Sequence, residues 1–185
     1  MPEVMVYHFT TWNLSDEHIG KVINVAWDAS NYWQHKMTRG WVPQLANLPD
    51  NITVNGIPMS SLNELLNHMK YTSELLKEYI FDEIRSNEYP SKPSRRKCMF
   101  AFSTVHDPDG YAKRLGFDRT RYRLMTLRVL EGTKLHFGDM VHLNTNLSDH
   151  KGIVEAARRY WAGADANLPT AEAVIEGPLE IVRYC

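Results

Sequence analysis

A hydroxyl and three cationic side chains stand together just ahead of a predicted strand, where they could bind phosphate. The run is Ser94, Arg95, Arg96 and Lys97. A guanidinium makes paired hydrogen bonds to phosphate oxygens, so Arg95 is the main candidate for a pyrophosphate contact, with the Ser94 hydroxyl beside it. The alternative is a solvated rim of charge, which is the ordinary role of such a run. That alternative applies most to Arg96 and Lys97.

Two further side chains offer polar chemistry from opposite ends of the chain. His8 lies in a short apolar run, and its neutral imidazole is both donor and acceptor, which suits a ribose diol. The alternative is a strand histidine bonded to backbone. Glu172 begins a late strand, where a fixed carboxylate can stabilise positive charge that develops on a ligand. Glu176 and Glu180 are rival carboxylates, and an ordinary surface role is the alternative for Glu172 itself.

The apolar patterns that must position these residues predict a strand, two helices and then a strand-rich half with two further helices. The first helix begins at Ser15 or Asp16 and runs to Trp33, and the second begins at the capping box at Ser61 and runs to Ile84. Residues 39–58 hold three prolines and two glycines, which favours a loop or a variable insertion.

The remaining elements follow from shorter patterns. A broad apolar face of the second helix comprises Leu62, Leu65, Leu66, Met69, Leu76, Tyr79, Ile80 and Ile84. Strands are predicted over 4–9, 97–103, 122–130, part of 136–143, 172–175 and 179–184, and short helices over 111–115 and from 148 or 149 to 161. A turn at Gly177-Pro178 is expected to join the last two strands. Tyr160 and Trp161 have helical spacing with apolar neighbours, which is typical of core residues. The alternative for both is a contact with substrate.

Composition limits the classes of function. A chain of 185 residues with 43% hydrophobic content predicts one domain with a real core. The 21 Lys and Arg residues against 22 Asp and Glu give a net charge of −1, which does not favour a globally basic nucleic-acid binder. No apolar run approaches a membrane span, and the N-terminus resembles no leader, so a cytoplasmic protein is expected. Cys98 and Cys185 are predicted to be free thiols, and no His spacing predicts a metal.

Three separated segments together resemble the nucleotide site of the ADP-ribosyltransferase superfamily. They are Tyr7-His8-Phe9-Thr10, the pair Phe100 and Tyr111 with ten residues between them, and Glu172 ahead of a strand. In that superfamily a His on the first core strand, an aromatic residue on the second and a Glu at the head of a late strand converge on NAD. The resemblance implies one α+β domain over residues 1–185, with a split, strongly twisted antiparallel core and a helical insertion at about 15–88.

The resemblance also implies a role for each segment. His8, with Phe9 and Thr10 beside it, would orient NAD by donating a hydrogen bond to a ribose hydroxyl or the carboxamide. Phe100 and Tyr111 would hold the nicotinamide ring between them, and Glu172 would stabilise the positively charged ribose as nicotinamide leaves. Ser94 and Arg95 would contact phosphate. The implied activity is mono-ADP-ribosylation of a protein or nucleic-acid acceptor, with NAD as substrate and no metal.

The chain departs from the superfamily pattern at two positions. Phe100 stands where the family usually has Tyr, so the ring is kept and the hydroxyl is lost. Thr170 stands where arginine-directed members carry Glu or Gln, which makes arginine a less expected acceptor. Segments 83–95 and 158–163 also resemble an uncharacterised bacterial family associated with this superfamily.

Two other functions remain open from the sequence. The same fold could carry a module that binds a nucleotide or a macromolecule without turnover, which the substituted Phe100 and the missing second acidic residue favour. A nucleic-acid-modifying transferase is the other, for which the basic stretch from Lys113 to Arg123 is the sequence hint. That stretch could equally coat a helix and a strand.

Overall fold

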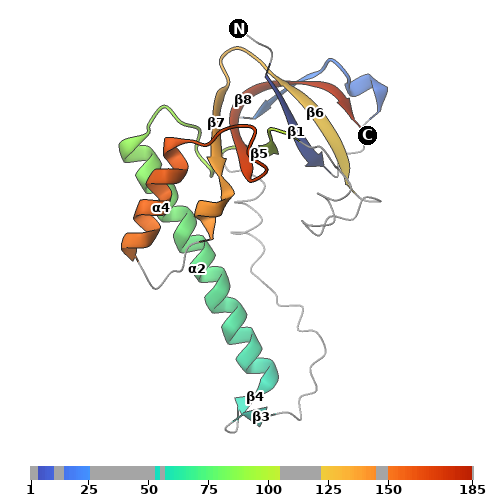
Figure 1. The fold of residues 1–185 in the computed structure, drawn as a ribbon. Coiled ribbons are helices and arrows are strands. Elements are labelled where there is room, and N and C mark those ends of the chain that lie inside the picture. Colours follow the sequence, from blue (N-terminus) through green and yellow to red (C-terminus); the bar gives the residue numbers. More distant parts are fainter. Residues whose placement is uncertain are drawn as a thin grey trace.

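The computed structural model describes residues 4–10, 15–25, 53–54, 57–104, 122–144 and 150–184, with the backbone alone for 53–71. The chain is an α+β protein in which two helices lie against a small sheet (Figure 1). The strands are β1 (Met5–Thr10), β2 (Val22–Val25), β3 (Thr53–Val54), β4 (Ile57–Pro58), β5 (Met99–Phe102), β6 (Arg123–Val129), β7 (Lys134–Asp139) and β8 (Ala171–Tyr184). The helices are α2 (Met59–Glu88) and α4 (His150–Ala162), with 3-10 turns η1 (Asp16–His18) and η2 (Met140–Leu143).

Four strands close into a small barrel. The ring runs β8-β5-β1-β6 and returns to β8, and every pairing in it is antiparallel. β7 pairs with the first half of β8, and β2 pairs with the second half. Alternate residues of these strands point inward and form an apolar core that includes Val6, Met125, Leu127 and Ile181. We call the buried residues of this apolar cluster the barrel core.

β8 serves both ends of the barrel because it changes partners half-way. Residues 171–176 lie between β5 and β7, and residues 177–184 lie between β2 and β6. Gly177 stands at the change with φ of 134°, a conformation that L side chains rarely adopt. A Cβ there would also lie 2.8 Å from Cα of Thr133, so the strand bends where only glycine fits.

β1 and β5 meet over a short stretch, which we call the β1–β5 seam. β1 pairs with β6 at six positions, but its register with β5 in the described residues is the single pair Tyr7 and Phe102. The imidazole of His8 extends the contact, because its Nδ1 lies 2.7 Å from the carbonyl oxygen of Phe100. A side chain therefore bridges the two strands where their backbone ladder is short.

The two helices pack together on one outer face of the sheet, beside β7 and β8 (Figure 1). α4 buries Ile153, Ala156, Ala157, Tyr160 and Trp161, which is the i, i+3, i+4, i+7, i+8 stripe of an amphipathic helix. The C-terminal part of α2 adds Ile80 and Phe81 to the same apolar cluster. Its other end extends away from the barrel, and β3 and β4 lie at that tip. α2 ends shortly before Pro90, because a proline disfavours helical geometry in the residue that precedes it.

Most predicted strands are confirmed, as are the helices predicted over 61–84 and from 148 or 149 to 161, but two predictions are wrong. Residues 22–25 do not continue a helix from Ser15; they form β2, which pairs with β8. Their β-branched residues suit a strand, and pairing with β8 outweighs the helical spacing of the apolar positions. The helical insertion at 15–88 is therefore wrong at its start. The final strands are one strand, β8, with no hairpin turn at Gly177-Pro178.

Some predictions lie outside the described residues, among them the helix over 111–115, Tyr111, and the first part of the 39–58 loop. The end of that loop contributes the short β3–β4 pair. Cys98 is a buried free thiol, as predicted. No helix in the described part of the chain is long and apolar enough to cross a membrane.

Candidate functional site

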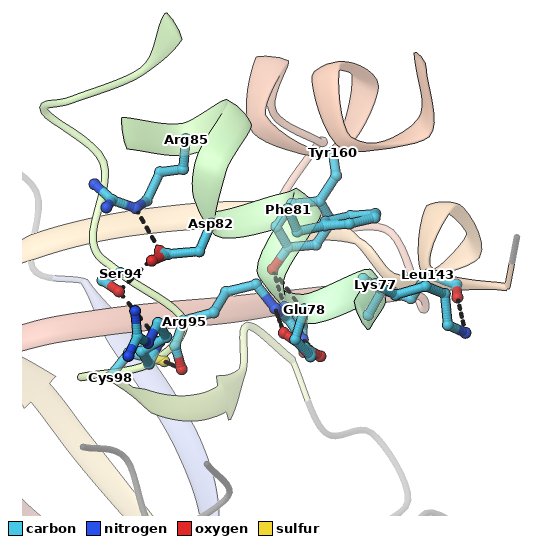
Figure 2. A network of polar contacts seen from close by, with 12 residues as sticks. Lys77, Glu78, Phe81, Asp82, Arg85, Ser94, Arg95, Cys98, Leu143 and Tyr160 are labelled. Atoms are coloured by element: carbon cyan, nitrogen blue, oxygen red, sulfur yellow. Dashed lines mark hydrogen bonds and ion pairs between the residues drawn. The ribbon is translucent and has the colours of Figure 1, made fainter. Parts of the chain in front are cut away.

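Arg95 lies in the loop between α2 and β5, buried between the helices and the sheet with 3% of its surface exposed. Its Nε donates to Glu78 at 2.8 Å and its Nη2 donates to the other oxygen of the same carboxylate at 3.2 Å. Its Nη1 donates to the hydroxyl of Tyr160 at 2.6 Å and to Oε1 of Glu172. Figure 2 shows Arg95, Glu78 and Tyr160 converging from the loop and the two helices. We call Glu78, Arg95, Tyr160 and Glu172 the helix-side cluster.

The charges of this cluster hold one another in place. Burial opposes the charged form of Arg95, but Glu172 and Glu78 outweigh it and raise the pKa of the guanidinium well above its usual value. A buried ion costs several kcal/mol unless it is paired and fully hydrogen-bonded, so each member needs the others. Two carboxylates and one guanidinium give the cluster a formal charge of −1. It therefore favours positive charge on a ligand that reaches it.

Tyr160 is the neutral member of the cluster. Burial and then the charge of Glu172 raise the pKa of its phenol well above the usual value, although Arg95 opposes them. The hydroxyl therefore stays protonated and donates to Oε1 of Glu172 at 2.6 Å, while it accepts from Arg95. Tyr160 and Trp161 are both fully buried, so the prediction that they are core residues is confirmed. The indole of Trp161 donates to the carbonyl of Phe81 at 2.7 Å.

Phe100 connects the helix-side cluster to the β1–β5 seam. The guanidinium of Arg95 lies over its ring, with Cζ 4.7 Å from the ring centroid. The backbone carbonyl of Phe100 accepts from Nδ1 of His8. A continuous path of contacts thus runs from His8 through Phe100 and Arg95 to Glu172. Tyr111, the expected partner of Phe100, lies outside the described residues.

The tautomer of His8 follows from its bond to Phe100. A carbonyl only accepts, so Nδ1 carries the proton and Nε2 keeps a lone pair. Burial lowers the pKa of His8, although the bond to Phe100 opposes the shift, so the ring is neutral at pH 7. Neutral His8 therefore offers an acceptor at Nε2. Its donor is used inside the protein, and the expected contact with NAD stays a prediction.

The sheet register places the predicted residues on two faces. Phe102 pairs with Glu172 and Phe100 with Val174, so Phe100 and Glu172 share the face toward the helices. His8 alternates with Tyr7 and shares the barrel-facing side with Val6. A ligand that touches both His8 and Glu172 must cross the sheet at the β1–β5 seam.

The remaining predicted contacts are buried in the protein. Ser94 is 8% exposed; its hydroxyl donates to Asp82 at 2.9 Å and its backbone N–H donates to Glu176 at 3.2 Å. Ser94 and Arg95 thus lie inside the fold, and their contact with phosphate stays a prediction. Arg96 and Lys97 are exposed, as the solvated alternative predicted.

Phe9 and Thr10 also lie inside, with 6% and 4% of their surface exposed. The ring of Phe9 packs edge-on against Phe102, with 6.1 Å between the centroids. The contact of Phe9 and Thr10 with NAD stays a prediction. Among the described residues, no group of three or more His, Cys, Asp or Glu side chains could hold a metal ion.

Sequence reasoning missed two members of the helix-side cluster. The predicted apolar face of the helix includes Leu76 and Tyr79, which are 51% and 42% exposed, and leaves out Glu78, which is 7% exposed. A carboxylate adjoining the apolar positions Ile80 and Phe81 was a weak signal. The hydroxyl of Tyr160 was missed because an aromatic residue at core spacing gives no sign of its polar partner.

One comparison with known proteins assigns the chain to a family. Residues 6–185 match the family described as a protein of unknown function, DUF2441. The chain belongs to the DUF2441 family. The match begins in β1 and extends beyond the end of β8, so His8, Phe100 and the whole helix-side cluster lie within the DUF2441 region. A search of the curated proteins finds no match.

Proposed function

We propose that this protein is an NAD-dependent mono-ADP-ribosyltransferase, built on a core of the ADP-ribosyltransferase type, that transfers ADP-ribose to a protein or nucleic-acid acceptor. The path of contacts from His8 through Phe100 and Arg95 to Glu172 carries the proposal. It connects the three sequence segments of the predicted NAD site, although they are separated by more than 160 residues of chain from His8 to Glu172. The adjacent strands β1, β5 and β8 bring them together.

The proposed reaction breaks the glycosidic bond between the ribose C1′ and the nicotinamide nitrogen. The bonding electrons leave with nicotinamide, and positive charge develops on the ribose at C1′ and the ring oxygen. The carboxylate of Glu172, in a cluster of net negative charge, stabilises that charge. A nucleophile of the acceptor then bonds to C1′ and loses its proton to solvent.

The other residues of the path hold the dinucleotide. The Phe100 ring packs against the nicotinamide, which is worth about 1 kcal/mol for an aromatic contact. His8 accepts at Nε2 from a ribose hydroxyl or from the carboxamide N–H. Arg95 holds the Glu172 carboxylate in place. In this arrangement the guanidinium of Arg95 contacts the carboxylates of Glu78 and Glu172, whereas the sequence suggested a contact with phosphate.

The test is nicotinamide release from NAD by wild-type protein and by Glu172→Gln, with cell lysate as the acceptor source. We expect Glu172→Gln to lower the rate about 100-fold or more, because the amide keeps the shape but loses the charge. Glu78→Gln is the matched control, since Glu78 is the other buried carboxylate on Arg95. It should keep a rate of the wild-type order. Equal losses in two folded variants would trace the effect to the ion pairs and remove Glu172 from the reaction.

A second candidate is a binding module that captures a nucleotide or a macromolecule without turnover. One observation favours it: the guanidinium of Arg95 already lies over Phe100 and pairs with Glu172, so the protein itself supplies a planar cation at this position. NAD that raises the melting temperature of the protein without any accumulation of nicotinamide would favour this function. Accumulation of nicotinamide would exclude it.

A further inference from the structure

The carboxylate of Glu172 is held by one oxygen. Oε1 accepts from both Arg95 and Tyr160, whereas Oε2 accepts from no described residue. The side chain keeps 10% of its surface exposed. A carboxylate clamped at one oxygen cannot rotate freely, so its second oxygen has a defined direction.

We infer that Tyr160 is a positioning residue, which with Arg95 fixes Oε1 of Glu172 and leaves Oε2 as the oxygen presented to a ligand. This inference rests on the proposed function for its kinetic consequence. The hydrogen bond from Tyr160 to Glu172 can be tested without it.

Gly138 makes the position of Tyr160 possible. Gly138 stands directly opposite Glu172 in the β7–β8 ladder, and the Tyr160 ring lies over it. A Cβ at Gly138 would lie 2.3 Å from Cε2 and 2.4 Å from Cζ of that ring. Any side chain here would push the phenol away from the carboxylate. Glycine inside a strand often marks such a close approach.

The ring of Tyr160 is also enclosed on its other sides. Edge-on contacts surround it, at centroid distances of 5.6 Å from Phe81, 5.5 Å from His136 and 4.9 Å from Trp161. Its backbone carbonyl accepts from Nε2 of His136 at 2.9 Å. These contacts fix the orientation of the Tyr160 ring and therefore the position of its hydroxyl. Little further ordering is needed to hold Glu172.

Tyr160→Phe is the direct test, because it keeps the ring on Gly138 and removes the hydroxyl alone. We expect kcat for nicotinamide release to fall about tenfold or more, as for the loss of a hydrogen bond to a charged group, with KM for NAD nearly unchanged. Tyr79→Phe, an exposed tyrosine on α2, is the matched control and should change neither constant. A Tyr160→Phe enzyme with wild-type kcat would overturn the inference.

Gly138→Ala is a second, independent variant. It should lower kcat as Tyr160→Phe does, and the double variant should lose little more, because both remove the same contact. Losses that multiply in the double variant would contradict a shared mechanism. Melting temperatures identify any variant that loses activity through unfolding.

A measurement on the resting protein separates this inference from the proposed function. In the proton NMR spectrum of the wild type, the buried Tyr160 hydroxyl should give a slowly exchanging resonance that vanishes in Tyr160→Phe and moves in Glu172→Gln. If wild-type protein releases no nicotinamide, the proposed function fails, and this resonance alone decides whether Tyr160 holds Glu172. A Tyr160 hydroxyl resonance that does not respond to Glu172→Gln would overturn the inference.

Discussion

The two buried regions of this protein are built on opposite principles. The barrel core holds ten buried residues, all of them apolar: Val6, Val25, Met99, Ala101, Met125, Leu127, Ala173, Ile175, Leu179 and Ile181. The region between the sheet and the helices instead buries Glu78, Arg95, His136 and Glu172 among its aromatic rings. Apolar packing is sufficient for a stable fold, and buried ions seldom improve on it. The difference is consistent with the role that we propose for the helix-side cluster.

Breaking the cluster at its centre should have the largest effect on stability. Arg95→Met leaves two buried carboxylates without a cation, which should lower the free energy of unfolding by about 3–5 kcal/mol. The measurement is urea denaturation. Arg96→Ala, at the exposed neighbouring position, is the control and should stay within about 0.5 kcal/mol of wild type. Leu127→Ala, in the barrel core, should lose about 2–5 kcal/mol through the cavity that it leaves.

If Arg95→Met and Arg96→Ala unfold at the same urea concentration, the ion pairs of Arg95 contribute nothing to stability. The contrast between the two buried regions would then lose its energetic basis.

Replacing the entire helix-side cluster with apolar residues sharpens the comparison. The variant combines Arg95→Met, Glu78→Leu, Glu172→Leu and Tyr160→Phe. Its free energy of unfolding should return close to that of the wild type, because no buried charge is left unpaired and apolar replacements of ion clusters are often neutral or stabilising. It should bind or convert no NAD. A stable quadruple variant with wild-type nicotinamide release would contradict the proposed site.

The smallest effect is a pH dependence from His136, which is 2% exposed. Burial, opposed by the bond to Tyr160, lowers the pKa of His136 from 6.5 to about 4. Between these two pH values His136 is protonated in the unfolded chain and neutral in the folded protein. The free energy of unfolding therefore falls as pH drops from about 6.5 toward 4. His136→Gln keeps a donor for the Tyr160 carbonyl and removes this titration.

The melting temperature should therefore fall more between pH 7 and pH 5 in the wild type than in His136→Gln. Other titrating groups contribute to both proteins and cancel in the difference. Parallel curves for the two proteins would show that His136 is not held neutral by the fold.

The sequence predicts the fold well where a pattern is local. The strands β1, β5 and β6 are short β-prone runs, and α4 shows its stripe in the spacing of its apolar residues. β2 was missed because Ile19, Val22 and Ile23 fit helical spacing as well as a strand, and its partner β8 lies more than 150 residues further along the chain. The sequence predicts a turn at Gly177-Pro178. The same two residues also suit a bend inside one strand, which is what the structure has.

The site shows the same limit more sharply. Glu172, Arg95 and Phe100 could be singled out by type and position, and the structure brings them into contact. Their hydrogen-bond partners could not be predicted from the sequence, because Glu78 and Tyr160 lie 17 and 65 residues from Arg95 along the chain. The direction of the His8 hydrogen bond depends on a backbone carbonyl 92 residues away. Residue types indicate chemistry, whereas tertiary contacts decide which atoms remain to perform it.

The most direct test of the central claim is transfer of labelled ADP-ribose from NAD to acceptors in a cell lysate. Wild-type protein should label a macromolecule and release nicotinamide in equal amount, and Glu172→Gln should do neither while Glu78→Gln does both. Folded wild-type protein that binds NAD, labels nothing and releases no nicotinamide would contradict the enzyme and leave a binding module.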